Sequence, residues 1–257
     1  MDNKKQQIEK FTYVLLVERI IGNPDSKKLV DWALEVLQQG YESENLYILA
    51  GLDNDSTEER EKFFEKSLED LNMEYPKTEE EHLKFYAVYI AEQVVKKEID
   101  VITGLRKMYE IAVKSQYNEL YMYFYSLEDE VNLLLNGFGS LFISDLTLEN
   151  YKDYVFEAFE LFLEKQILKI PAEEQSKFYC NNCRQFVNFK LDNKKMLKKI
   201  WNFKLITKRE KWWQIRKRPV AKFPSPVCEI CGSMNLMSAY KHSIQRLLIE
   251  KYKKKQA

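Results

Sequence analysis

Apolar side chains recur at steps of three and four along the first two thirds of the chain, which is the spacing of one helix face. This pattern first predicts a helix over 8–21, which the GNP sequence at 22–24 ends. Leu29 and Trp32 lie on the apolar face of a second expected helix, which Ser26 is expected to cap. Gly40 is expected to end that helix in a left-handed conformation.

Polar capping residues mark the starts of further helices. Ser56 and Glu59, like Thr78 and Glu81, have the spacing of a capping box, which predicts helices over about 57–72 and 79–97. The other expected caps are Ser43, before a short helix that Gly51 ends, Asp100, and Thr147, before a long helix that reaches Ile170 and stops at Pro171. About seven helices with short loops favour an antiparallel helical array.

Three segments within this helical part share a pattern with known proteins. They read LVDWALEVLQQGYESENLYILAGLD, EEREKFFEKSLEDLNM and YAVYIAEQVVKKEIDVITGLRKMYEIA. On these segments, residues 26–165 resemble a set of small, all-helical bacterial proteins of unknown function. The shared positions are Trp32, Gly40, Tyr41, Ala50, Gly51, Asp100, Gly104 and Arg106, whereas Lys97 stands where those proteins have a small residue. The resemblance implies a helical, bacterial protein but no reaction or ligand.

Composition agrees with a mainly helical, folded chain. Of 257 residues, 45% are hydrophobic, and only 7 are Gly and 6 are Pro, too few for a sheet protein rich in turns. Charges interrupt every apolar stretch before the roughly 20 residues that a membrane helix needs, so no membrane span is expected. The polar start MDNKKQQIEKF lacks the apolar core of a secretory signal, and a cytoplasmic location is therefore expected.

The net charge of zero hides two oppositely charged parts. From Lys177 to Ala257 there are 21 Lys and Arg against four acids, a net charge of about +17. The remaining 19 basic and 36 acidic residues give residues 1–176 about −17. We therefore expect an acidic all-helical domain over 1–170 and a basic module over 171–257.

The basic part contains all four cysteines of the chain, in two C-x-x-C pairs. Cys180 and Cys183 form one pair, and Cys228 and Cys231 form the other. This spacing lets two tight turns direct four sulfurs at one metal ion, and it predicts a zinc ribbon-like module with one structural Zn²⁺. Four thiolates leave no open position for water or substrate, which argues against a catalytic metal. A closing helix is expected after the second pair.

Other uses of the cysteines are also possible from the sequence. An iron–sulfur cluster takes four thiolates as well, although no redox or radical motif accompanies them. A thioredoxin-like redox pair would need a strand–helix context that neither pair shows.

Forty-four residues separate Cys183 from Cys228, and this insert is rich in basic and aromatic residues. Cations neutralise phosphates and aromatic rings stack on bases, so the insert is a candidate nucleic-acid surface. A second reading is that the basic residues dock on the acidic helices or on a protein, and that the rings only cover the ribbon. The candidate residues are Lys194, Lys195, Lys198, Lys199, Trp201, Lys208, Arg209, Lys211, Trp212, Trp213, Arg216, Lys217 and Arg218.

The sequence contains no recognisable catalytic motif, and we expect a protein that is not an enzyme, although a nuclease built from scattered acids would escape such a search. The acids beside His82 read as helix caps, and the aromatic segment 117–130 reads as packing or as a ligand groove. The leading hypothesis is a bacterial adaptor that binds nucleic acid through the basic module and a protein through the acidic helices. The alternative is an immunity or defence-accessory module that binds only protein. Opposite charges also permit self-association.

Overall fold

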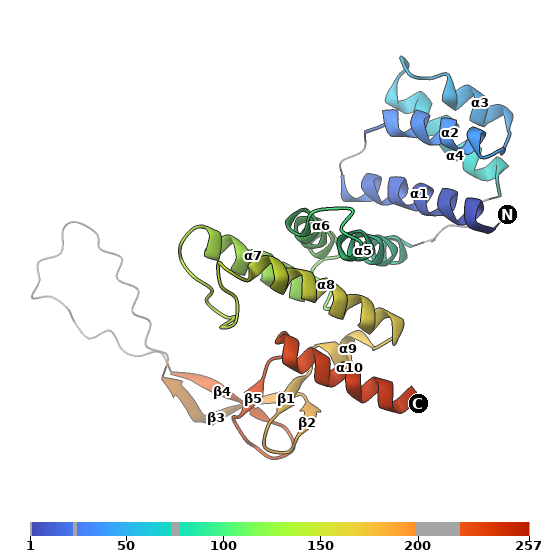
Figure 1. Cartoon of the computed structure of the whole chain (residues 1–257). Helices are drawn as coiled ribbons and strands as arrows, with labels where there is room; N and C mark the ends of the chain where they lie inside the picture. Colours follow the sequence, from blue (N-terminus) through green and yellow to red (C-terminus); the bar gives the residue numbers. More distant parts are fainter. Residues whose placement is uncertain (1, 23–24, 73–77, 199–221, 257) are drawn as a thin grey trace, which may run out of the picture. The chain divides into compact units, whose positions relative to one another are not determined.

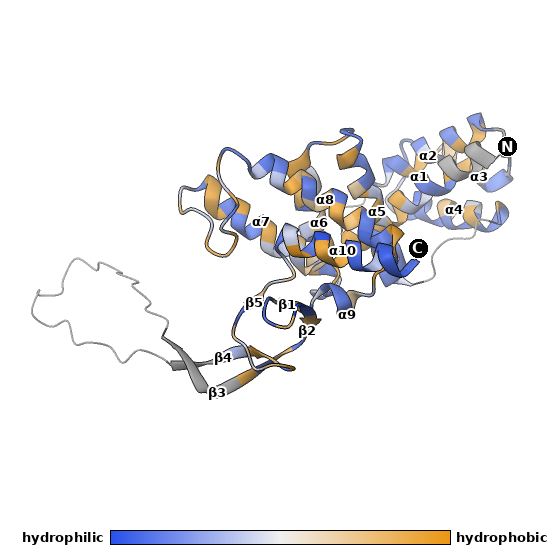
Figure 2. Cartoon of the chain, turned by 60° about the horizontal axis from the view of Figure 1, so that its bottom comes forward, coloured by the Kyte–Doolittle hydropathy of each residue, from blue (hydrophilic) through white to orange (hydrophobic). Residues whose placement is uncertain are grey.

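The computed structural model describes residues 2–22, 25–72, 78–198 and 222–256. The chain divides into two compact units, Met1–Ile167 and Leu168–Ala257, which we call the helical unit and the cysteine unit. The described residues are mainly helical, with a small strand-rich region and a closing helix near the C-terminus (Figure 1). None of the described helices combines the length and apolarity needed to cross a membrane, and Figure 2 shows polar and apolar residues mixed along them.

The helical unit consists, over its described residues, of eight helices joined by short loops. Their bounds are α1 Asp2–Ile21, α2 Lys27–Gln38, α3 Glu44–Ala50, α4 Thr57–Asp70, α5 Glu79–Val95, α6 Val101–Lys114, α7 Met122–Leu135 and α8 Tyr151–Ile167. Helices α1 to α4 pack together, α5 packs on α1, α6 and α8, and α7 packs on α6. The predicted helical array is therefore present.

Trp32 lies at the centre of the core between α1, α2 and α4. Its side chain is fully buried, and its indole N–H donates to the hydroxyl of Thr12 at 2.8 Å. The ring meets Phe64 edge to face, with ring centroids 4.8 Å apart. The apolar face that the sequence periodicity predicts is thus buried at Trp32. The one polar atom of this side chain, the indole nitrogen, has a hydrogen-bond partner.

Close packing of α5, α6 and α8 requires a glycine. A Cβ atom placed on Gly104 of α6 would lie 2.3 Å from Cγ2 of Val94 and 3.3 Å from the ring of Phe159. Gly104 therefore lets the three helices approach more closely than any larger residue would permit.

Most of the predicted helix caps are confirmed, and the short predicted helix starts as expected. The hydroxyl of Ser43 accepts from the N–H of Leu46, and Thr78 and Glu81 form a complete capping box. The carboxylate of Asp100 accepts from two N–H groups of α6, and Gly40 has the expected positive φ of 89°.

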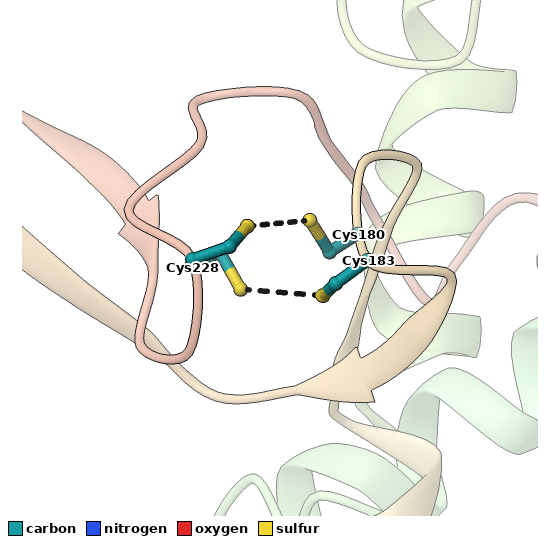
Figure 3. A group of neighbouring side chains, drawn as sticks. Cys180, Cys183 and Cys228 are labelled. Atoms are coloured by element: carbon teal, nitrogen blue, oxygen red, sulfur yellow. Dashed lines mark hydrogen bonds between the residues drawn. The ribbon is translucent and has the colours of Figure 1, made fainter.

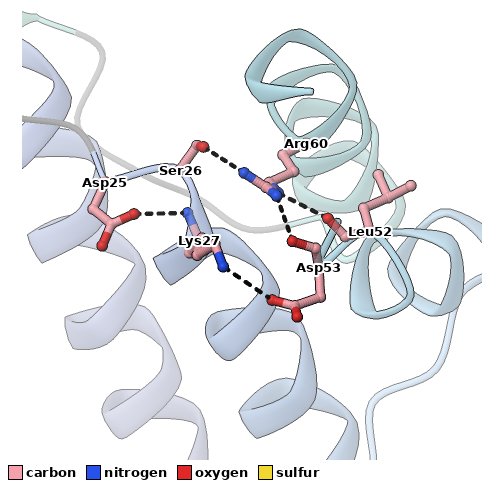
Figure 4. Close-up of polar contacts among 6 residues, drawn as sticks. All are labelled: Asp25, Ser26, Lys27, Leu52, Asp53 and Arg60. Atoms are coloured by element: carbon pink, nitrogen blue, oxygen red, sulfur yellow. Dashed lines mark hydrogen bonds and ion pairs between the residues drawn. The ribbon is translucent and has the colours of Figure 1, made fainter. Parts of the chain in front are cut away.

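The capping role predicted for Ser26 is wrong. Its side chain makes no capping hydrogen bond to α2 and instead accepts from Arg60 at 2.9 Å (Figure 4). The buried guanidinium of Arg60 also donates to the carbonyl oxygens of Leu52 and Asp53, at 2.8 and 2.6 Å. Burying this charge without hydrogen-bond acceptors would be costly. The hydroxyl of Ser26 therefore accepts a hydrogen bond from Arg60 and not from the N–H groups at the start of α2.

The long helix predicted after Thr147 is shorter than expected at both ends. Helix α8 begins at Tyr151, after a turn in which the side chain of Asn150 accepts from the N–H of Thr147. The helix ends at Ile167, and Lys169 then has a positive φ of 50° before Pro171.

The cysteine unit contains all the described strands of the chain. Its elements are α9 Ala172–Gln175, β1 Phe178–Cys180, β2 Gln185–Val187, β3 Phe189–Lys198, β4 Lys222–Cys228, β5 Leu236–Met237 and α10 His242–Gln256. Strands β2, β1 and β5 form one antiparallel sheet, and β3 pairs with β4 in a second one. The predicted closing helix corresponds to α10.

Candidate metal centre

The first C-x-x-C pair lies where β1 turns into β2. Cys180 is the last residue of β1, and Cys183 lies in the turn that follows. The N–H of Arg184 donates to the carbonyl of Cys180 at 2.8 Å and closes the turn. Arg184 has a φ of 55°, a left-handed conformation that residues with a Cβ atom seldom adopt. We call residues 180–184 the first knuckle.

The second pair repeats this geometry at the end of β4. Cys228 ends the strand, and the N–H of Gly232 donates to its carbonyl at 2.9 Å. Gly232 has a φ of 66°, which glycine adopts without strain. Residues 228–232 form the second knuckle, so each C-x-x-C pair is followed by one residue in the left-handed region.

Hydrogen bonds link each knuckle to a residue that lies close in sequence to the other knuckle. The backbone N–H of Asn181 donates to the carbonyl of Asn235 at 3.1 Å, and their side-chain amides are paired at 3.0 Å. The carboxylate of Glu229 accepts from the N–H of Asn188 at 3.0 Å. These contacts hold the two turns together, and the sequence pattern did not reveal them.

The four sulfur atoms come together in one cluster. The Sγ atoms of Cys180 and Cys231 are 3.6 Å apart, those of Cys183 and Cys228 are 3.8 Å apart, and all four lie within 4.8 Å of one another (Figure 3). A disulfide needs about 2.0 Å, and all four cysteines are free. A tetrahedron with metal–sulfur bonds of about 2.3 Å has edges of about 3.8 Å. The cluster therefore has the donor set and nearly the size that a tetrahedral metal ion requires.

Local hydrogen bonds and burial affect two of the thiols in opposite directions. The pKa of the Cys231 thiol is lowered to about 6 by a hydrogen bond from the backbone N–H of Ser233, with help from the side chain of Asn182. Desolvation, together with hydrogen bonds among the cysteines, raises the pKa of Cys183 to about 12. The thiolate of Cys231 therefore forms more readily than that of Cys183. A divalent cation at the centre would favour the thiolate form of the sulfurs that bind it.

The described residues of the basic insert form β2 and the paired strands β3 and β4. Their register runs from Phe189 opposite Cys228 to Lys198 opposite Lys222, with an irregularity between Asp192 and Met196. Lys194, Lys195 and Lys198 lie in β3, but their side chains are outside the described part of the structure. The other ten candidates lie outside the described residues: Lys199, Trp201, Lys208, Arg209, Lys211, Trp212, Trp213, Arg216, Lys217 and Arg218.

Two further patterns in the helical unit have structural explanations. Glu81 completes the capping box of α5, as expected for the acid cluster beside His82. In the aromatic segment, Tyr121, Tyr123 and Phe124 are buried in the core. Packing therefore accounts for much of that segment.

Comparison of the chain with protein families, with curated proteins and with solved structures finds no match. The four clustered sulfurs and the basic insert between them are therefore the features of the chain that bear on function.

Proposed function

We propose that this protein is a non-catalytic bacterial adaptor, cytoplasmic in location, whose cysteine unit is a zinc ribbon-like module that binds nucleic acid and whose helical unit binds a protein. One structural Zn²⁺ would be held by Cys180, Cys183, Cys228 and Cys231. The observation that carries the proposal is the clustering of four free thiols within 4.8 Å, on two knuckles that a strongly basic insert separates.

A metal ion bound by these four sulfurs would have a structural role. Zinc with four thiolates has no position for water or substrate, so it can stabilise a fold but cannot activate a nucleophile. The described core cluster at the knuckles is small, with Cys180, Val187 and Cys228 buried and Cys183 and Leu236 packed against them. A core this small needs a metal or another cross-link to be stable.

The insert is the part of this unit that fits a phosphate backbone. It carries 14 Lys and Arg and two acids between Cys183 and Cys228, together with three tryptophans. Counterion release would supply the affinity, and the indole rings suit unpaired bases. The strands β3 and β4, which flank the central part of the insert in sequence, pair with each other, and Phe189 of β3 lies opposite Cys228.

The experiment is a fluorescence titration of labelled single-stranded and double-stranded oligonucleotides with the full, zinc-loaded chain at several salt concentrations. We expect affinity to fall linearly with salt on logarithmic axes, by on the order of 10³ between 50 and 200 mM if about six phosphates are contacted. The variant Arg216→Glu/Lys217→Glu/Arg218→Glu should abolish binding at 150 mM salt.

A matched control carries the same change in charge on the exposed end of α10, as Lys253→Glu/Lys254→Glu/Lys255→Glu. The control should weaken binding much less than the insert variant. Equal losses in the two variants would mean that net charge, and not the insert, attracts the oligonucleotide. Absence of binding at low salt would refute the nucleic-acid role and favour a module that binds only protein.

A further inference from the structure

Figure 1 shows a long connection between α7 and α8. Several of its large apolar side chains are exposed. Phe138 is 74% exposed, Leu141 63% and Phe142 79%. Single exposed apolar residues are common, but a group on one connection, residues 136–150, indicates a binding surface. Together with their exposed neighbours, these residues form what we call the apolar ridge: Leu135, Phe138, Leu141, Phe142 and Leu148.

A buried carboxylate holds this connection in one conformation. Glu130 of α7 is 3% exposed, and its Oε2 atom accepts from the backbone N–H groups of Leu141 and Phe142, at 2.8 and 3.2 Å. The hydroxyl of Ser140 contacts the same oxygen and also accepts from the N–H of Ile143 at 3.2 Å. A buried carboxylate without such donors would be strongly disfavoured, so Glu130 fixes the backbone that displays the two exposed residues.

The backbone on the other side of Phe138 is fixed as well. Its N–H donates to the carbonyl of Leu133 at 3.0 Å, and it lies between Gly137 and Gly139, whose φ values are 81° and 73°. The ring is therefore displayed by a defined turn that closes the end of α7. A surface already in its binding conformation loses little conformational entropy when a partner docks.

The segment that carries the ridge bears negative charge only. Between residues 115 and 151 the chain has six acids and neither Lys nor Arg. Among these acids, Glu119, Asp129, Asp145 and Glu149 are exposed. Nucleic acid and anionic lipid surfaces would be repelled, and two copies meeting through the same ridge would bring like charges together. The complementary partner has an apolar face bordered by cations.

We propose that the apolar ridge is a docking site for a basic amphipathic peptide segment of a partner protein. The inference rests on the proposed function. It names the surface through which the helical unit would bind its protein partner, and it specifies that the partner is basic and amphipathic. The exposed phenyl rings supply the apolar contacts of the interface, and Asp145 and Glu149 select for Lys and Arg at its edge.

The test uses the full, zinc-loaded chain and a fluorescent peptide of about 18 residues in which Leu and Lys are spaced to form an amphipathic helix. Anisotropy reports binding, and a peptide with Glu in place of every Lys is the comparison. We expect the Lys peptide to bind and the Glu peptide not to bind. The variant Phe138→Ser/Phe142→Ser should weaken binding by about tenfold or more, as expected for interface residues of high energetic weight.

Two further variants distinguish specific binding at the ridge from non-specific apolar binding and from purely electrostatic binding. Leu34→Ser/Tyr47→Ser removes two exposed apolar side chains from α2 and α3 and should leave the affinity within about twofold of wild type, as for residues outside the interface. Asp145→Lys/Glu149→Lys should weaken the Lys peptide and make its binding less sensitive to salt.

Equal loss in the two serine variants, or unchanged binding in Phe138→Ser/Phe142→Ser, would overturn the proposal. Sedimentation could also overturn the proposal. If the wild-type chain is a dimer and Phe138→Ser/Phe142→Ser is a monomer, a second copy of the chain occupies the ridge. The oligonucleotide titration on the same preparation keeps the two proposals apart. Loss of oligonucleotide binding alone would refute the nucleic-acid role, and loss of peptide binding alone would refute the ridge.

Discussion

The two knuckles provide an internal comparison of backbone strain at equivalent positions. Arg184 and Gly232 each follow the second cysteine of a pair, have φ values of 55° and 66°, and donate to the carbonyl of the first cysteine. Only Arg184 carries a Cβ atom, so it alone is strained there. Replacing Arg184 with Gly should strengthen metal binding, and replacing Gly232 with Ala should weaken it.

The expected size follows from two opposing terms. A residue with a Cβ atom costs roughly 1–2 kcal/mol in the left-handed region, which glycine avoids. A glycine also makes the unfolded chain more flexible, which lowers the stability of the folded state by about 0.4–1 kcal/mol and offsets part of the gain. Each substitution should thus change the free energy by about 0.5–1 kcal/mol, with opposite signs. A Cβ atom on Gly232 would meet nothing within 4 Å, so no steric clash adds to this value.

Because folding of such a module is coupled to metal binding, the strain should appear as a change in zinc affinity. The assay is competition of the full chain with a chromophoric zinc chelator at fixed pH. The dissociation constants of the Arg184→Gly and Gly232→Ala variants should differ by about 5- to 30-fold, which corresponds to about 1–2 kcal/mol.

Arg184→Ala is the control, because it removes the positive charge near the thiolates and keeps the Cβ atom. Its affinity should stay close to wild type. The strain argument fails if Arg184→Gly binds zinc no more tightly than Arg184→Ala, or if Gly232→Ala binds as tightly as wild type.

Three other changes test the fold and the site. Gly104→Ala should destabilise the protein by about 1–2 kcal/mol in urea unfolding, because overpacking outweighs the gain in helix propensity, and a Val94→Ala background should remove most of this cost. Burial lowers the pKa of Lys165 to about 7, whereas the unfolded chain keeps a pKa of about 10.4. From pH 7 to 10 the unfolded state therefore binds more protons, and the free energy of unfolding should rise with pH by at most about 1.4 kcal/mol per pH unit, a slope that Lys165→Met should abolish. Cys180→Ser or Cys228→Ser should lower the metal content and the hydrogen-exchange protection of the cysteine unit, while α5 to α8 keep their protection; equal loss in both units would contradict this.

Sequence periodicity and local caps predicted the helical unit well where interactions are short in range. The caps at Ser43, Thr78 and Asp100 depend only on neighbouring N–H groups, and each is present. Ser26 failed as a cap because Arg60, 34 residues away, needs its oxygen as an acceptor. Such a demand arises from tertiary packing, which no local pattern contains.

At the candidate metal site, the cysteine spacing predicted which sulfurs converge, since a C-x-x-C turn fixes two sulfurs on one side. It did not reveal the left-handed backbone of Arg184, because nothing in that residue type signals a positive φ. The cysteine spacing also did not predict the amide pair between Asn181 and Asn235, because this pair forms only when two turns that are distant in sequence meet. The support that Glu130 gives to the apolar ridge depends in the same way on a contact between a helix and a loop.

The most direct test of the account is the metal content and metal coordination of the purified full chain. Elemental analysis with X-ray absorption at the metal edge should find one zinc per chain, bound by four sulfur atoms at about 2.3 Å. Iron with inorganic sulfide would contradict the structural zinc site and replace it with a cluster. A chain that carries no metal, with all four thiols reactive in the native state, would contradict any metal centre and remove the support on which the basic insert depends.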